Sequence, residues 1–91
     1  MKKNPHAAVI LGLTIRELRQ ARRMSQEAVA LEAGVDRTFL TRVENGMHSP
    51  SFDSILAISS ALGISLTQLS RKFEDNMGKT KHEKNHVDQS T

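Results

Sequence analysis

Several residue types that support particular chemistries are missing or scarce in this chain of 91 residues. Cysteine is absent, which excludes disulfide bonds, thiolate zinc sites, iron–sulfur clusters and cysteine nucleophiles. Tryptophan and tyrosine are absent too, and with only three Phe the core must be aliphatic. The longest strictly apolar run, residues 7–11, is far shorter than the roughly 20 residues that span a bilayer. We therefore expect a protein of the reducing cytoplasm with no membrane partner.

The length, composition and charge of the chain indicate one globular domain whose first 73 residues are basic. Apolar residues make up 37% of the chain and charged residues 25%, and a chain of this length builds a single core. Residues 1–73 carry ten Lys and Arg against six Asp and Glu, whereas residues 74–91 carry three against four. A basic body suits a polyanionic partner, although many unrelated domains share so modest an excess.

Apolar spacing predicts helices between residues 9 and 73 and no strand, because apolar positions recur every three or four residues. Residues typical of helix ends divide this pattern: Ser25, Asp36, Ser51 and Ser65 at starts, and Gly34, Gly46 and Gly63 at ends. The sequence therefore predicts an all-α domain of five helices over residues 1–73, with the second helix near 26–33 and the third near 37–45.

The helical pattern stops after residue 73. Residues 74–91 are almost entirely polar and bury too little surface to offset the entropy of ordering them, so we expect a disordered tail. His82 and His86 in this tail match the H-E-x-x-H pattern of zinc peptidases. Such a site also needs a buried cleft and a third ligand. We therefore predict no catalytic residue, no metal and no cofactor.

The most informative pattern spans residues 26–45, where a short turn joins two short helices. A bend this sharp needs a small residue at the helix crossing, supplied by Ala30, and a residue that accepts left-handed backbone geometry, supplied by Gly34. The positions that fill the inner angle are all apolar: Val29, Ala33, Val35, Leu40 and Val43. This spacing is that of a DNA-binding helix-turn-helix, with a plain helical hairpin as the alternative.

Specific segments around this bend carry a further resemblance. They are Ser25-Gln26-Glu27, Ala30, Gly34-Val35, the run 42–46, Pro50-Ser51-Phe52 and the run 58–69. Together they resemble the Xre/Cro family of phage-repressor-like DNA-binding domains. Within that family, the runs 36–39 and 42–44 are similar to the recognition helix of restriction–modification controller proteins. The resemblance implies a small homodimeric regulator that binds its own promoter region.

A recognition helix lies in the major groove with its N-terminal turns nearest the base edges. Leu40 and Val43 face inward, and the other sides of the helix carry the candidate base-reading residues: Arg37, Thr38, Phe39, Thr41 and Arg42. Each Arg can pair with O6 and N7 of guanine. Two roles are open for Phe39. It contacts the DNA, as the Tyr of controller-like relatives does at this position, or it fills the core beside the next helix.

Gln26, Asn45 and His48 are candidates for contacts to the DNA backbone. Gln26 begins a helix, and the exposed N–H groups of a helix N-terminus bind phosphate. Asn45 and His48, just after the third helix, would form a second contact to phosphate. Family members often carry Lys or Arg around positions 47–48, where this chain has Met47 and His48, which puts the strength of that second contact in doubt. A solvated loop residue is the alternative for His48.

The resemblance also implies a structural ion pair between Arg19 and Glu44 that fixes the third helix against the first. Two separately solvated charges are the alternative. Arg23 stands where family members usually have Gly, so it either takes a strained positive φ or adds a charge near the DNA backbone.

Leu66, Leu69 and Phe73 of the fifth helix are candidates for a dimer interface, with completion of the domain's own core as the alternative. We favour a homodimer because helix-turn-helix proteins read two half-sites with two copies. The sequence thus predicts a five-helix, repressor-like domain that binds a double-stranded DNA operator and regulates transcription by excluding or contacting RNA polymerase. The alternative is an antitoxin-type protein-interaction module that also regulates its own operon.

Overall fold

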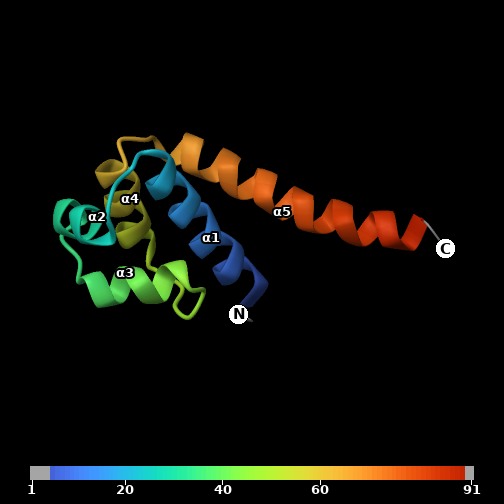
Figure 1. The fold of residues 1–91 in the computed structure, drawn as a ribbon, viewed down its shortest axis with the longest axis horizontal. Coiled ribbons are helices and arrows are strands. Elements are labelled where there is room, and N and C mark those ends of the chain that lie inside the picture. Colours follow the sequence, from blue (N-terminus) through green and yellow to red (C-terminus); the bar gives the residue numbers. More distant parts are fainter. Residues whose placement is uncertain (1–4, 90–91) are drawn as a thin grey trace.

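The computed structural model describes the backbone of residues 5–89 and the side chains of residues 6–79. Its elements are α1 (Pro5–Ala21), α2 (Gln26–Ala33), α3 (Arg37–Glu44), α4 (Phe52–Ala61) and α5 (Leu66–Gln89). Figure 1 shows the first four helices gathered in a compact body, from which the far end of α5 projects. The prediction of an all-α domain with five helices is confirmed.

Local capping explains where these helices begin. The Ser25 hydroxyl accepts a hydrogen bond from the Ala28 N–H at 3.0 Å, which starts α2. At the start of α5, the Gln68 N–H donates to the Ser65 hydroxyl at 3.1 Å and the Ser65 N–H donates to Gln68 Oε1 at 2.8 Å. This reciprocal pair is a capping box, which fixes the entry into α5.

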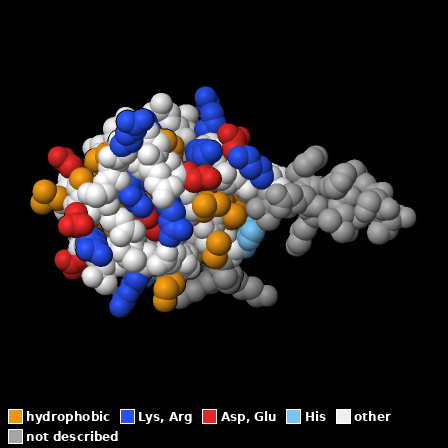
Figure 2. Space-filling view, viewed as in Figure 1, with side chains coloured by type: hydrophobic (Ala, Val, Ile, Leu, Met, Phe, Trp, Pro, Cys, Tyr) orange, Lys and Arg blue, Asp and Glu red, His pale blue; other side chains and the backbone are white. Residues whose placement is uncertain are grey.

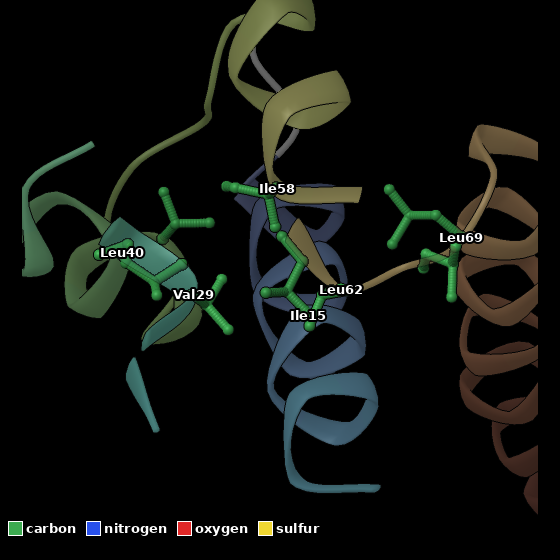
Figure 3. Packing of buried hydrophobic residues seen from close by; sticks show 9 residues of the cluster. Ile15, Val29, Leu40, Ile58, Leu62 and Leu69 are labelled. Carbon is green, nitrogen blue, oxygen red and sulfur yellow. The ribbon is translucent and has the colours of Figure 1, made fainter. Parts of the chain in front are cut away.

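The core is aliphatic and draws on all five helices. Figure 3 shows side chains of the cluster converging between the helices, with Ile15, Val29 and Leu40 from α1, α2 and α3. These three side chains are fully buried, as are Val43 of α3 and Ile58 of α4. Burial of aliphatic side chains contributes about 25 cal/mol per Å² of apolar surface. The core therefore holds α2 and α3 on a rigid support.

α1 and α3 cross closely at Gly12. A Cβ at this position would lie 2.8 Å from the carbonyl oxygen of Glu44 and closer still to that of Val43. Only glycine permits this approach, because any side chain would meet the backbone of α3. The crossing places the C-terminal end of α3 directly against α1.

α5 continues past Phe73, so the domain boundary predicted between residues 73 and 74 is wrong. Asn76 is only 4% exposed, and its amide donates to Thr14 Oγ1 at 2.9 Å and to Glu17 Oε1 at 3.0 Å. These bonds fasten α5 to α1 through polar atoms, which the spacing of apolar residues does not indicate. Residues 74–79 therefore belong to the packed domain rather than to a disordered tail.

Two further predictions concern metal binding and the crossing of a membrane. His82 and His86, the pair in the H-E-x-x-H pattern, lie outside the residues whose side chains are described. In the part that is described, no three or more His, Asp or Glu side chains are grouped so as to hold a metal ion. Over the same part, no single helix has the length and apolar character to cross a membrane, and only the sharply bent pair of α4 and α5 meets both criteria together.

Candidate nucleic-acid interface

The turn between α2 and α3 presents α3 at the surface of the body. Gly34 takes φ +73°, and the N–H groups of Gly34 and Val35 donate to the carbonyls of Leu31 and Ala30 at 3.2 and 3.0 Å. These bonds close the end of α2 in left-handed geometry, which glycine adopts without steric cost. Ala30 is 3% exposed at the bend, as its small size requires.

The outer face of α3 carries exposed polar and cationic side chains. Arg37, Thr38 and Arg42 are exposed, whereas Leu40 and Val43 on the inner face are fully buried. Arg37 Nη1 lies 3.8 Å from Glu27 Oε1, and both side chains are mostly exposed, so this pair holds Arg37 only weakly. In Figure 2, Lys and Arg side chains lie across the middle of the compact body, with acidic side chains between them.

Thr41 faces α2 rather than open solvent. Its hydroxyl lies 3.0 Å from Gln26 Oε1 and 3.0 Å from the Arg37 carbonyl oxygen, and it has one proton to donate between them. The residue is half-buried. The Thr41 hydroxyl is therefore engaged by hydrogen bonding within the domain.

Phe39 lies at the edge between the core and the loop that follows α3. It is half-buried and packs against the core cluster. Its ring also meets His48 edge to face, with centroids 5.0 Å apart and planes at 68°. His48 itself is exposed in the loop after α3. The contact joins the outer side of α3 to this loop.

Glu44 is the centre of a polar network that links α1, α2 and α3. Arg19 donates from Nε to Oε2 at 2.7 Å and from Nη2 to Oε1 at 3.0 Å, so the predicted ion pair is present and bidentate. The Glu44 side chain is 0% exposed and that of Arg19 13% exposed. Arg19 Nη1 also donates to the Met24 carbonyl at 2.8 Å. This pair fixes the end of α3 against α1.

Gln26 belongs to the same network. Its amide Nε2 donates to Glu44 Oε1 at 3.0 Å, and its Oε1 faces the Thr41 hydroxyl. The side chain predicted to bind phosphate thus also takes part in hydrogen bonds within the protein. The amide nitrogen of Gln26 carries two hydrogens and Glu44 accepts one of them, so a phosphate contact through the second N–H is compatible with this network.

Arg16 is a residue of this network that the sequence reasoning missed. Its Nη2 donates to Asn45 Oδ1 at 2.6 Å, and its Nε lies 3.6 Å from Glu44 Oε1. The signal that could have found it is its position three residues before Arg19, which puts both on one face of α1. Asn45 and Arg16 thereby meet beside the C-terminal end of α3.

Arg23 takes the strained geometry that the sequence raised as one alternative. Its φ is +54°, and it is the only non-glycine residue with positive φ in the part of the chain that the structure describes. A side chain in this region costs roughly 1–3 kcal/mol. The residue is exposed, so its charge is also available to solvent.

An apolar pocket of about 330 Å³ lies between α1, α4 and α5. Leu66, Leu69 and Phe73 all line it, and Phe52 at its edge is 60% exposed. Leu69 is 2% exposed and belongs to the domain's own core, which is the alternative that the sequence left open to its role in a dimer interface. The pattern of apolar spacing along α5 does not indicate which of these three side chains is buried. Leu66 and Phe73 are half-buried.

Comparisons with known proteins agree with this geometry. A family model described as helix-turn-helix matches residues 15–69, more than half of the chain. The control protein C.BamHI of Bacillus amyloliquefaciens is 37% identical over 57 residues, which cover 62% of this chain and 70% of that protein. The structure of the restriction–modification controller protein C.AhdI from Aeromonas hydrophila is 39% identical, with a TM-score of 0.66 over 68% of this chain and 94% of the other.

A further solved structure shares the fold at lower identity. It is the restriction–modification controller protein C.Esp1396I, as a tetramer in complex with its natural 35 base-pair operator. The TM-score is 0.74 at 20% identity, covering 77% of this chain and 92% of that one. At this identity the likeness concerns the fold alone.

Proposed function

The chain belongs to the Xre-type helix-turn-helix family of DNA-binding transcription regulators, and we propose that it binds a symmetric operator as a homodimer. The observation that carries this proposal is the division of α3 into two faces. Leu40 and Val43 fix one face in the core, while Arg37 and Arg42 are exposed on the other. The family is one of regulators rather than enzymes.

The exposed face of α3 reads the bases. Arg37 and Arg42 can each make a bidentate pair with guanine O6 and N7, worth roughly 1–3 kcal/mol of discrimination per pair. Thr38 donates or accepts a hydrogen bond, and its methyl group can contact a thymine methyl. Phe39 and Thr41 flank this face and define its edge toward the loop after α3 and toward α2.

Contacts to phosphate set the register of the domain on the duplex. Gln26 at the N-terminus of α2 takes one of these positions, with the helix dipole favouring a negative charge there. Asn45 and His48 at the other end of α3 take a second. These contacts strengthen binding to any sequence and carry no base information.

Dimerisation uses the pocket between α1, α4 and α5. Phe52 exposes 60% of its surface beside this pocket, and a two-fold axis would bring the Phe52 of each copy toward the pocket of the other. Leu66 and Phe73 supply further apolar surface on α5. Two copies can then contact half-sites about 34 Å apart on one side of the duplex.

Regulation follows from occupancy of the operator. A bound dimer either excludes RNA polymerase from a promoter or touches it from an adjacent site. The names of C.BamHI and C.AhdI, with identities of 37% and 39%, support the controller of a restriction–modification system as the specific role.

Selection from a pool of random duplexes tests this function and identifies the operator in the same experiment. We expect enrichment of an inverted repeat whose half-sites are centred about one helical turn, or a multiple of it, apart. Enrichment of no sequence, or of a single half-site without symmetry, would contradict the proposal.

The dimer is tested by Phe52→Glu, with Leu31→Glu as the matched control. Leu31 is 83% exposed on α2 and does not line the pocket. Sedimentation equilibrium should show a monomer for Phe52→Glu and a dimer for the control. If both variants remain dimers, this surface is not the interface.

A further inference from the structure

The polar network at the end of α3 places two arginines, Arg16 and Arg19, beside a single carboxylate, that of Glu44. Glu44 has one negative charge, and Arg19 already satisfies both of its oxygens through a bidentate pair. Gln26 adds a third donor at 3.0 Å. Arg16 approaches the same carboxylate only at 3.6 Å, which is too long for a hydrogen bond. Arg16 is therefore a second cation beside a charge that is already paired.

Arg16 also remains accessible where Arg19 does not. The side chain of Arg16 is 38% exposed, against 13% for Arg19. Its nearest partner is neutral, because Nη2 donates to the amide oxygen of Asn45 at 2.6 Å. A partly exposed guanidinium that shares its carboxylate partner, Glu44, with the more closely bound Arg19 is suited to bind a further anion from solvent.

The same hydrogen bond orients Asn45. Because Oδ1 accepts from Arg16, the amide nitrogen Nδ2, a donor, is turned away from the guanidinium. Asn45 is exposed and follows directly after α3. A donor amide and a guanidinium thus stand side by side at the C-terminal end of the recognition helix.

Building on the DNA-binding function proposed above, we propose that Arg16 is a DNA-backbone residue that neutralises one phosphodiester and sets the Asn45 amide toward the same strand. It supplies from α1 the cation that positions 47 and 48 lack in this chain, where Met47 and His48 stand. The contact is independent of base sequence, because the ligand is a phosphate oxygen.

The test is the salt dependence of binding to a fluorescein-labelled poly(dI-dC) duplex, measured by anisotropy at several KCl concentrations. Each phosphate contact contributes about 0.9 to the slope of log K against log salt. We expect Arg16→Gln to lower this slope by about 0.9. Arg16→Lys should keep the slope, because it keeps the charge.

Arg71→Gln is the matched control, since Arg71 is an exposed cation on α5 and its removal changes the net charge equally. It should leave the slope unchanged. An unchanged slope in Arg16→Gln, or equal losses in Arg16→Gln and Arg71→Gln, would overturn the inference. Failure of the unmutated protein to bind any duplex would instead overturn the proposed function. Urea unfolding of each variant checks that the fold is retained.

Discussion

Replacing Glu44 by Gln should destabilise the domain strongly while preserving the shape of the side chain. The substitution removes the charge that Arg19 faces at 2.7 and 3.0 Å. It also places an amide NH₂ group among donors from Arg19 and Gln26, so at least one donor loses its acceptor. The Glu44 side chain is 0% exposed, so water cannot replace the lost interactions there.

The size of the effect follows from the burial of the partner. Removing one member of a buried ion pair costs about 3–5 kcal/mol. Arg19 is 13% exposed and keeps the Met24 carbonyl as an acceptor at 2.8 Å, which places the cost near the lower end, about 3 kcal/mol. With a urea m-value of about 1 kcal/mol per molar for a small domain, the midpoint should fall by about 3 M.

Equilibrium unfolding in urea, followed by far-ultraviolet circular dichroism, measures this shift. Glu27→Gln is the matched control, because Glu27 is 76% exposed and lies 3.8 Å from Arg37 in a surface pair worth at most about 1 kcal/mol. A midpoint for Glu44→Gln that stays within about 0.5 M of the control would refute the account of this network.

Three other substitutions test separate features of the fold. Gly12→Ala should cost about 3 kcal/mol and weaken DNA binding, because its Cβ would press on the backbone of α3; unchanged melting would contradict the close crossing. Arg23→Gly should stabilise by about 1 kcal/mol in thermal unfolding by relieving φ +54°, and a loss of stability would show that Arg23 is not strained. Asn76→Ala should cost about 1–2 kcal/mol and speed hydrogen exchange of amides in 74–79, whereas intact protection there would exclude its role in fastening α5 to α1.

The sequence predicts the framework of this fold because its signals are local. Helix starts at Ser25 and Ser51 depend on a hydroxyl that reaches a backbone N–H three residues ahead, at 3.0 and 3.1 Å. The bend at Gly34 depends on one residue's backbone freedom. The bidentate pair of Arg19 and Glu44 joins residues far apart in the chain, and the family resemblance rather than spacing indicates it.

The features that the sequence did not predict depend on contacts between distant segments. Asn76 lies in a polar stretch of the sequence. Its packing role depends on the hydrogen bond to Thr14, which forms only when α5 folds against α1. Gly12 lies inside a helix, where the sequence gives no sign of a turn or helix end. It is needed because its missing side chain lets α3 approach α1. Leu69 shares a helical stripe with Leu66 and Phe73, and only the packed structure shows that it is buried in the core.

A scan of single base-pair substitutions across the selected operator tests the central claim most directly, with the unmutated protein compared with Arg42→Ala and Gln26→Ala. The account predicts that Arg42→Ala loses roughly 1–3 kcal/mol of discrimination at one guanine and little elsewhere. Gln26→Ala should instead weaken binding to every duplex by a similar factor. Equal losses on the operator and on unrelated DNA for both variants would mean that the exposed face of α3 does not read bases.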